Sequence, residues 1–205
     1  MENQAPEKKK NVFLISGLVF LVLFVLPLGS IYFLNSGLQY RKTSVSELSD
    51  LGKVGDFNLN NQNNLPVSPA MLRGRVAVVN FFSENDSIAK FQADRIANVH
   101  QNYNDVEDVL FLSFIHSDTS INLINAASSL GITDHKQWYL LSTQGNQWKD
   151  ISTNNFKIPN IENGVALVDT SMTIRKIYDL NSNPEMGRLV EQIAIVIPKQ
   201  KRRGM

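Results

Sequence analysis

The chain has 205 residues, a formal net charge of +1 and no cysteine. Without thiols it cannot form a disulfide, a thiolate zinc site, an iron–sulfur cluster or a cysteine nucleophile. Its length and its apolar content of 43% are typical of one globular domain with an accessory segment.

The first element is an apolar run from Val12 to Leu34, with 18 apolar side chains among 23 positions and no charge. As a helix it would be about 34 Å long, which exceeds the ~30 Å hydrocarbon thickness of a bilayer. The run is longer than the apolar region of a signal peptide, and it continues past Gly29 and Ser30. We therefore expect an uncleaved transmembrane helix over residues 12–34, with the lipid bilayer as its partner.

The flanking charges predict the orientation of this helix. Lys8–Lys10 stand directly before it, whereas Arg41 and Lys42 follow at a greater distance. The positive-inside rule then places residues 1–11 in the cytoplasm. The remainder of the chain would lie on the far side of the inner (cytoplasmic) membrane.

Three segments are expected beyond the helix. Residues 35–53 are polar and indicate a linker, residues 54–198 form the domain, and residues 199–205 are a basic tail interpreted as a solvated end. Residues 43–198 carry 17 acidic and 11 basic side chains, a balance that argues against nucleic-acid binding.

Strands and helices alternate along the domain. The runs over 75–82 and 109–115 are almost continuously apolar, which is typical of strands buried on both faces of a sheet. Strands are predicted over 56–59, 65–67, 75–82, 109–115, 138–141, 164–168 and 173–178. Helices are predicted between and after them: a short one from Pro69 to Gly74 capped by Ser68, one over 86–103, one ending near Gly131, one over 143–153, and a last one over 184–197 capped by Asn183. This order predicts an α/β fold with a mixed sheet flanked by helices.

Two further expectations concern the helices of the domain. Apolar side chains of the helix over 86–103 fall approximately on one face: Ile88, Phe91, Ile96, Val99 and Tyr103. Asp86 or Ser87 is expected to cap that helix, and Asp118 or Thr119 the next one.

Four segments in this order resemble the thioredoxin-like Sco/SenC family, and the match covers most of residues 54–200. Val54–Leu59 resembles the opening "P-x-F-x-L" strand of the family, and Leu72–Phe82 resembles the "L-x-G-K-x-x-x-x-x-F" segment that leads to its active-site loop. Trp138–Leu141 resembles "W-x-x-L-T-G", and Gly164–Tyr178 resembles the late "Y-L-I-D-x-x-G" hairpin. A single membrane anchor before the domain also fits.

The resemblance implies a function whose residues are missing here. Family members bind copper through C-x-x-x-C and a distant histidine, and either help to assemble the copper centre of cytochrome c oxidase or reduce disulfides. Matching the motif places Asn85 and Ala89 where the cysteines belong, and residues 161–163 (Ile, Glu, Asn) near the histidine. Because copper(I) prefers soft ligands and disulfide exchange requires a thiolate, we expect no metal, no cofactor and no catalytic residue. A non-catalytic factor that binds a protein in the membrane or periplasm, in cytochrome c oxidase assembly, is the favoured hypothesis.

Two alternatives stay open. A copper or other metal-handling protein could use non-cysteine ligands such as His116, Glu162 and Met172. The second alternative is an enzyme derived from thioredoxin-like oxidoreductases, although the sequence gives no signal of a base that would activate Ser83 or another serine as a nucleophile. For the remaining histidines we expect plain surface or hydrogen-bonding roles, with His100 exposed and His135 in a polar connection.

Overall fold

The structure is a computed structural model that describes residues 7–117 and 121–198. The chain divides into two compact units, Met1–Ser44 and Val45–Met205. Of the predicted helix caps, Asp118 and Thr119 lie outside the described residues, as does the basic tail over 199–205.

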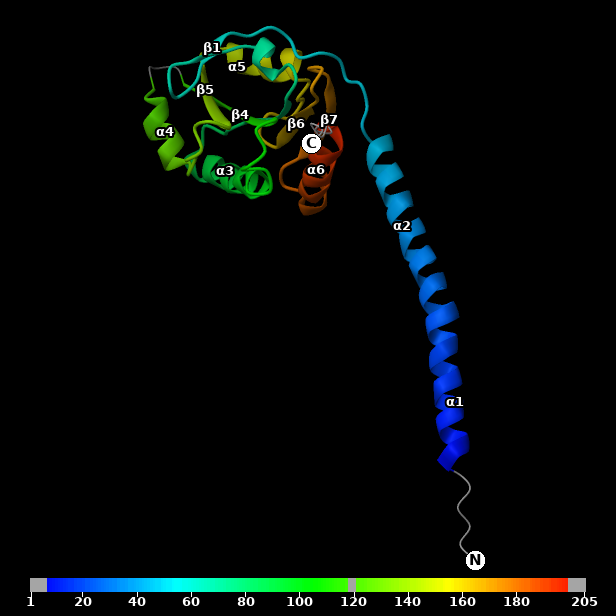
Figure 1. Cartoon of the computed structure of the whole chain (residues 1–205). Helices are drawn as coiled ribbons and strands as arrows, with labels where there is room; N and C mark the ends of the chain where they lie inside the picture. Colours follow the sequence, from blue (N-terminus) through cyan, green and yellow to red (C-terminus); the bar gives the residue numbers. More distant parts are fainter. Residues whose placement is uncertain (1–6, 118–120, 199–205) are drawn as a thin grey trace, which may run out of the picture. The chain divides into compact units, whose positions relative to one another are not determined.

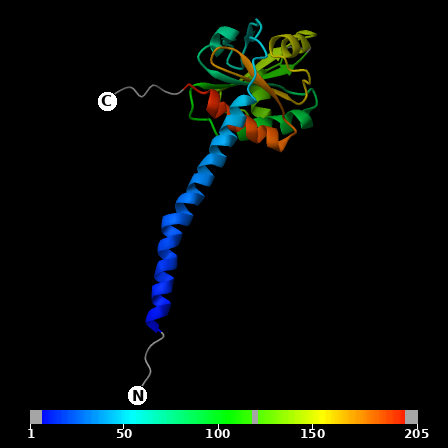
Figure 2. The ribbon, with the colours of Figure 1, turned by 90° about the vertical axis from the view of Figure 1, so that its right-hand side faces the viewer.

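The N-terminal unit is helical through α1 (Glu7–Phe20), a π-helical turn (Leu21–Val25) and the first part of α2 (Leu26–Ser46), as Figures 1 and 2 show. The π turn ends two residues before Pro27, which has no N–H to donate and whose ring crowds the preceding turn. By length and composition, Leu14–Asn35 could cross a membrane, in agreement with the candidate span predicted over 12–34.

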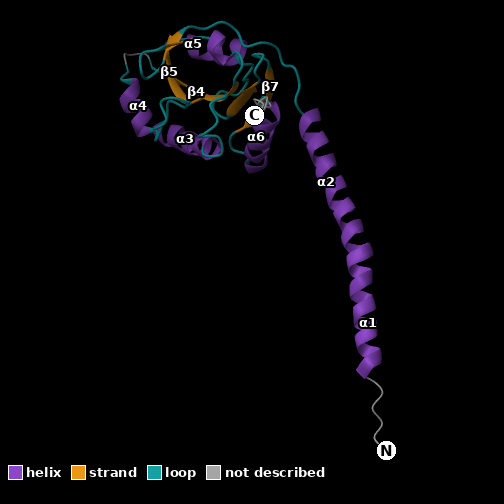
Figure 3. Ribbon diagram, viewed as in Figure 1, coloured by secondary structure: helices purple, strands orange, loops and turns teal. Residues whose placement is uncertain are grey.

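A five-stranded mixed sheet forms the centre of the second unit (Figure 3). Its order is β5-β4-β3-β6-β7, in which β3 and β4 and then β4 and β5 are parallel, while β6 is antiparallel to both β3 and β7. The strands are β3 (Val76–Phe81), β4 (Val109–His116), β5 (Trp138–Thr143), β6 (Gly164–Val168) and β7 (Ile174–Asp179). The predicted mixed sheet is confirmed, and the two most apolar runs are its central β3 and its neighbour β4.

Helices cover both faces of this sheet, because side chains of each buried strand alternate between two cores. Val78 and Phe111 face the first core, which is covered by α3 (Asp86–His100), α4 (Leu123–Ser129) and α6 (Asn183–Val196). Val79 and Leu112 face the second core, which includes Ile151 and Phe156 from the segment of α5 (Gln147–Asp150) and the π-helical turn Ile151–Asn155. The predicted flanking helices are thus confirmed.

The face of α3 that packs on the sheet differs from the predicted one. Ile96 and Val99 are buried as expected, but Ile88 and Phe91 are 42% and 48% exposed. Ala89, Gln92 and Ala93 occupy the buried stripe instead. The prediction followed the large apolar side chains, whereas two alanines and a glutamine form the packed face at this end of α3.

Other segments of the chain bond to part of each edge of the sheet. Beyond β5, the hairpin of β1 (Leu59–Asn60) and β2 (Pro66–Val67) presents the amide of Gln62, which accepts from Leu140 N at 2.8 Å and donates to Trp138 O at 2.7 Å. Beyond β7, residues within the expected 35–53 linker bond to the strand, with Ser49 N donating to Arg175 O at 2.8 Å. Helix α2 itself continues to Ser46, within the segment predicted as a linker.

Several caps differ from those predicted. Ser182 rather than Asn183 caps α6, where its side chain accepts from Glu185 N, and Asn122 caps α4 through Asn125 N. Ser68 precedes the short 3-10 helix Pro69–Leu72 but makes no capping hydrogen bond. Neighbouring polar residues offer equivalent caps in sequence, and only the backbone geometry decides between them.

A chain of buried hydrogen bonds crosses the sheet within the first core. Trp138 Nε1 donates to Ser113 Oγ at 2.8 Å, and Ser113 Oγ donates to Asn80 Oδ1 at 2.7 Å. All three side chains are at most 2% exposed. Three neighbouring strands are therefore joined through their side chains as well as their backbones.

Replacing Ser113 with alanine tests this connection. The variant leaves the Trp138 N–H and the Asn80 oxygen buried without these partners, which costs about 1–3 kcal/mol. We expect that loss in the free energy of unfolding, measured on the full chain in detergent by urea titration and tryptophan fluorescence. Both tryptophans lie in the second unit. An equal loss in the exposed Ser128→Ala control would contradict the assignment.

Glu47 connects the start of the second unit to β7 and α6. Its carboxylate accepts from Lys176 Nζ at 2.7 Å and Gln192 Nε2 at 3.1 Å, and lies 3.4 Å from Arg188 Nη2. The hydrogen bond from Lys176 is the main cause that holds the pKa of Glu47 below its ordinary value. Burial raises the pKa of Tyr178, whose hydroxyl donates to Gln192 Oε1 within the same network.

The lowered pKa of Glu47 predicts a pH dependence of stability. The stabilisation is complete above the ordinary pKa of 4.5 and is lost as the pH falls through the lower pKa of the folded protein. We expect Glu47→Gln to flatten the decrease in the free energy of unfolding below pH 4.5, whereas the exposed Glu107→Gln control keeps it. Parallel curves for the wild type and Glu47→Gln would contradict this expectation.

Candidate functional site

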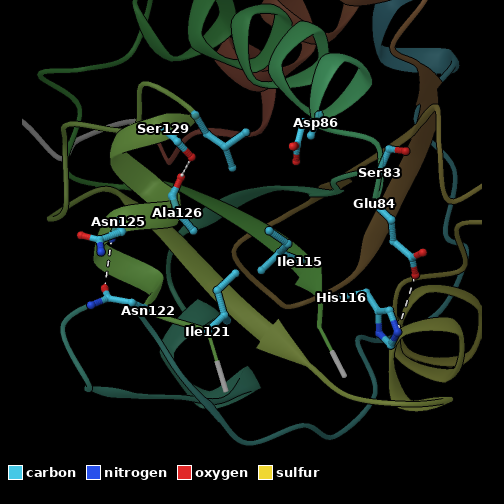
Figure 4. A pocket seen from close by; sticks show the side chains of 12 residues that line it. Ser83, Glu84, Asp86, Ile115, His116, Ile121, Asn122, Asn125, Ala126 and Ser129 are labelled. Atoms are coloured by element: carbon cyan, nitrogen blue, oxygen red, sulfur yellow. Dashed lines mark hydrogen bonds and ion pairs between the residues drawn. The ribbon is translucent and has the colours of Figure 1, made fainter. Parts of the chain in front are cut away.

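A cleft of about 520 Å³ opens at the carboxyl ends of β3 and β4 (Figure 4). The loop after β3, the end of β4, the first turns of α3 and the length of α4 form its walls. The lining residues are Ser83, Glu84, Asp86, Ala89, Ile115, His116, Ile121, Asn122, Asn125, Ala126, Ser129 and Leu130. Carboxyl ends of parallel strands are the usual place for a site in an open α/β sheet.

Asn85 and Ala89, the positions matched to the family cysteines, have structural roles here. The Asn85 carboxamide oxygen caps α3 by accepting from Ser87 N at 3.1 Å and Ile88 N at 3.2 Å. This corrects the expectation that Asp86 or Ser87 is the cap. Ala89 is 4% exposed and packs in the first core at the wall of the cleft.

Gln92 joins the loop after β3 to the loop before β6. Its side chain is 1% exposed, accepts from Ser83 N at 2.7 Å and donates to Glu162 O. These are the two loops on which the resemblance places the metal ligands of the family. The role of Gln92 was not predicted from the sequence. The signal that could have indicated its burial is its position on the same helical stripe as Ala89, Ala93 and Ile96.

His116 lies where its position at a strand end predicts, inside the cleft. Its Nε2 is 3.6 Å from Glu84 Oε1, and its ring packs on Trp148 with centroids 5.6 Å apart. The side chain is only 13% exposed. His116 thus forms part of the wall of the cleft.

The three alternative ligands, His116, Glu162 and Met172, are not brought together. Glu162 precedes β6 at the same end of the sheet as His116, as its contact with Gln92 shows. Met172 lies in the β6–β7 turn at the opposite end, because β6 runs antiparallel to β3. Within the described residues, no group of three His, Asp or Glu side chains is arranged to hold a metal ion.

The remaining histidines also lie at the opposite end of β4. His100 packs on Phe111 and Trp138 with its Nε2 3.2 Å from Asp134 Oδ2, and its side chain is 13% exposed, so the expectation of an exposed His100 is wrong. The ring of His100 contacts Phe111, which is about 17 Å along the strand from His116. His135 precedes β5 at the same end as His100. Metal–nitrogen bonds of about 2 Å cannot span such a separation.

The chemical groups of the cleft suit recognition. Among the described residues, its acidic side chains are the exposed carboxylates of Glu84 and Asp86; His116 also lines it, and no lysine or arginine does. Amides and hydroxyls of α4 face an apolar surface that includes Ile115 and Leu130. Asp86 also stands in the first turn of α3, where the helix dipole favours a negative charge.

Comparisons with known proteins identify the fold. A SCO1/SenC family lipoprotein from Bacillus anthracis is similar, with 19% identity and a TM-score of 0.61 over 73% of this chain and 98% of that chain. BsSco, a member of the Sco family of cytochrome c oxidase assembly proteins, has 17% identity and a TM-score of 0.61 over 73% of this chain and 96% of that chain. A copper-bound ScoI from Bradyrhizobium japonicum has 18% identity and a TM-score of 0.52 over 71% of this chain and 98% of that chain.

The similarity extends to other thioredoxin-like proteins. The thioredoxin domain of a thiol-disulfide oxidoreductase from Bacteroides vulgatus has 14% identity and a TM-score of 0.54, over 73% of this chain and 99% of that chain. No protein-family model and no curated protein matches the sequence. At these identities the comparisons establish the thioredoxin-like fold, as the resemblance predicted.

The Gln92 bridge predicts a local effect on loop dynamics. Gln92→Leu keeps the size of the side chain but removes both hydrogen bonds, leaving Ser83 N and Glu162 O without this partner. We expect faster hydrogen–deuterium exchange over 83–85 and 160–163, and a loss of about 2 kcal/mol in the free energy of unfolding. The exposed Gln101→Leu variant at the C-cap of α3 is the matched control. Unchanged exchange in both loops of Gln92→Leu would contradict the bridging role.

Proposed function

We propose that this protein is a membrane-anchored, Sco-type factor that binds another protein and carries neither copper nor electrons. The observation that supports this most strongly is the cap at Asn85, which uses the first matched cysteine position to hold α3 in place. The second position, Ala89, serves as packing. A preserved fold around a cleft without thiols is suited to holding a partner.

The proposed topology follows the charge pattern. Residues 1–11 lie in the cytoplasm, residues 12–34 cross the inner membrane, and residues 54–198 form the extracytoplasmic domain. The lysines at 8–10 support this orientation through the positive-inside rule. Residues 35–53 connect the two parts, although the second unit already begins at Val45.

The proposed process is the assembly of cytochrome c oxidase. The three Sco proteins described above are similar in structure, and BsSco is a member of the Sco family of cytochrome c oxidase assembly proteins. The separation of His116 from Met172 argues against a shared metal site of those side chains. We therefore propose a non-catalytic role, in which binding to an assembly intermediate is itself the function.

Crosslinking in intact membranes tests the binding function. A photoreactive phenylalanine analogue replaces Ile121, which lines the cleft, or Gln101, which lies outside it. We expect the Ile121 position alone to crosslink a discrete protein of the membrane or the extracytoplasmic space. Identical crosslinks from both positions, or none from Ile121, would contradict a function at the cleft.

Copper(I) competition tests the absence of metal chemistry. The full chain in detergent should leave copper(I) with a chromophoric chelator, whereas the control Asn85→Cys/Ala89→Cys supplies two thiolates and should withdraw it. Stoichiometric withdrawal by the wild type would overturn the proposal of a metal-free role.

A further inference from the structure

We infer that the cleft binds a protein segment in which apolar side chains stand next to lysine or arginine, an inference that rests on the proposed function. The cleft combines an apolar surface with a side that carries two carboxylates, neither of which pairs with a lysine or arginine of the described residues.

The apolar part of the cleft can accept side chains of a partner. Its volume of about 520 Å³ is within the range of ligand-binding sites. Ala89 and Leu130 are buried in the wall, and Ile121 is 36% exposed at the opening. Further exposed apolar side chains lie on the two helices that border the cleft, Phe91 on α3 and Ile124 on α4, 48% and 53% exposed.

The negative side selects the charge of the partner. Within the described part of the chain, neither Glu84 nor Asp86 forms an ion pair with a lysine or arginine, and Glu84 has only His116 at 3.6 Å. Among the described residues that line the cleft there is no lysine or arginine to pair with them. A partner that places lysine or arginine against these carboxylates complements the field, whereas an acidic segment is repelled.

Other binding modes are less favoured by the chain itself. Addition of a partner strand needs a free sheet edge, but Gln62 bonds to Trp138 and Leu140 at the edge of β5, and Ser49 bonds to Arg175 at the edge of β7. The carboxylates also disfavour an anionic lipid headgroup. A symmetric contact between two copies of this cleft is disfavoured as well, because the same carboxylates of both copies would face and repel each other.

Peptide binding to the full chain in phosphatidylcholine nanodiscs tests the inference. The probe is the fluorescein-labelled decapeptide GSGLKFRGSG, compared with GSGLEFEGSG and with GSGSKSRGSG by fluorescence anisotropy. We expect binding of the first probe only, weakened as salt is raised. Equal binding of the acidic probe, or of the probe without apolar side chains, would overturn the inference.

A pair of charge variants locates the binding. Glu84→Gln/Asp86→Asn should weaken the first probe by about threefold to tenfold, as expected for the loss of two exposed ion pairs. Asp105→Asn/Glu107→Gln makes the same charge change in a cleft of similar size, about 500 Å³, elsewhere on the domain and should leave the affinity unchanged. Equal weakening in both variants would show general electrostatic attraction and overturn the inference.

The two proposals can fail separately. If the probes show no such preference while Ile121 still crosslinks a discrete protein in membranes, the chemistry inferred for the segment is wrong and the binding function stands. If the Ile121 crosslink is also absent, both are wrong. A stable dimer of the full chain, dissociated by Ile121→Ser, would assign the cleft to a second copy and overturn the inference.

Discussion

The buried carboxamide of Gln92 is the interaction on which the arrangement of the site depends. It accepts from Ser83 N and donates to Glu162 O, so one neutral side chain satisfies a polar group in each of two loops. A buried amide of this kind stabilises only while both partners are present, because either one left unpaired carries a desolvation penalty. The resemblance to the Sco/SenC family places metal ligands on these same loops. Here a hydrogen-bonded bridge joins the loops directly.

The surrounding structure is consistent with a preformed binding surface. Asn85 fixes the start of α3, and α3 and α4 border the cleft whose negative side is formed by Glu84 and Asp86. Other segments of the chain bond to part of each sheet edge, and the cleft lies at the carboxyl ends of β3 and β4. A candidate membrane helix precedes the domain, and Glu47 fastens the beginning of the domain to β7 and α6.

The sheet could be predicted from the sequence because its signal is strong and local. Continuous apolar runs identified β3 and β4, and the order of elements led to the thioredoxin-like fold. The details of the site could not be predicted in the same way. A glutamine on a helix normally indicates a solvent-exposed position, so Gln92 gave no warning of its contacts with Glu162, 70 residues away. The choice of Asn85 over Asp86 as the cap depends on backbone angles, and the burial of His100 depends on Phe111 and Trp138 from other elements.

We propose that the cleft surface, rather than metal or redox chemistry, performs the function. The most direct test is the amount of assembled cytochrome c oxidase, from its haem absorbance, in membranes of cells that carry defined variants. Ala126→Arg fills the cleft from α4, and Ser128→Arg places the same side chain on the exposed face of that helix. The account predicts that Ala126→Arg, expressed and folded, reduces the oxidase to the level of cells lacking the protein, while Ser128→Arg retains the wild-type level. Wild-type amounts of oxidase with the cleft filled would contradict it.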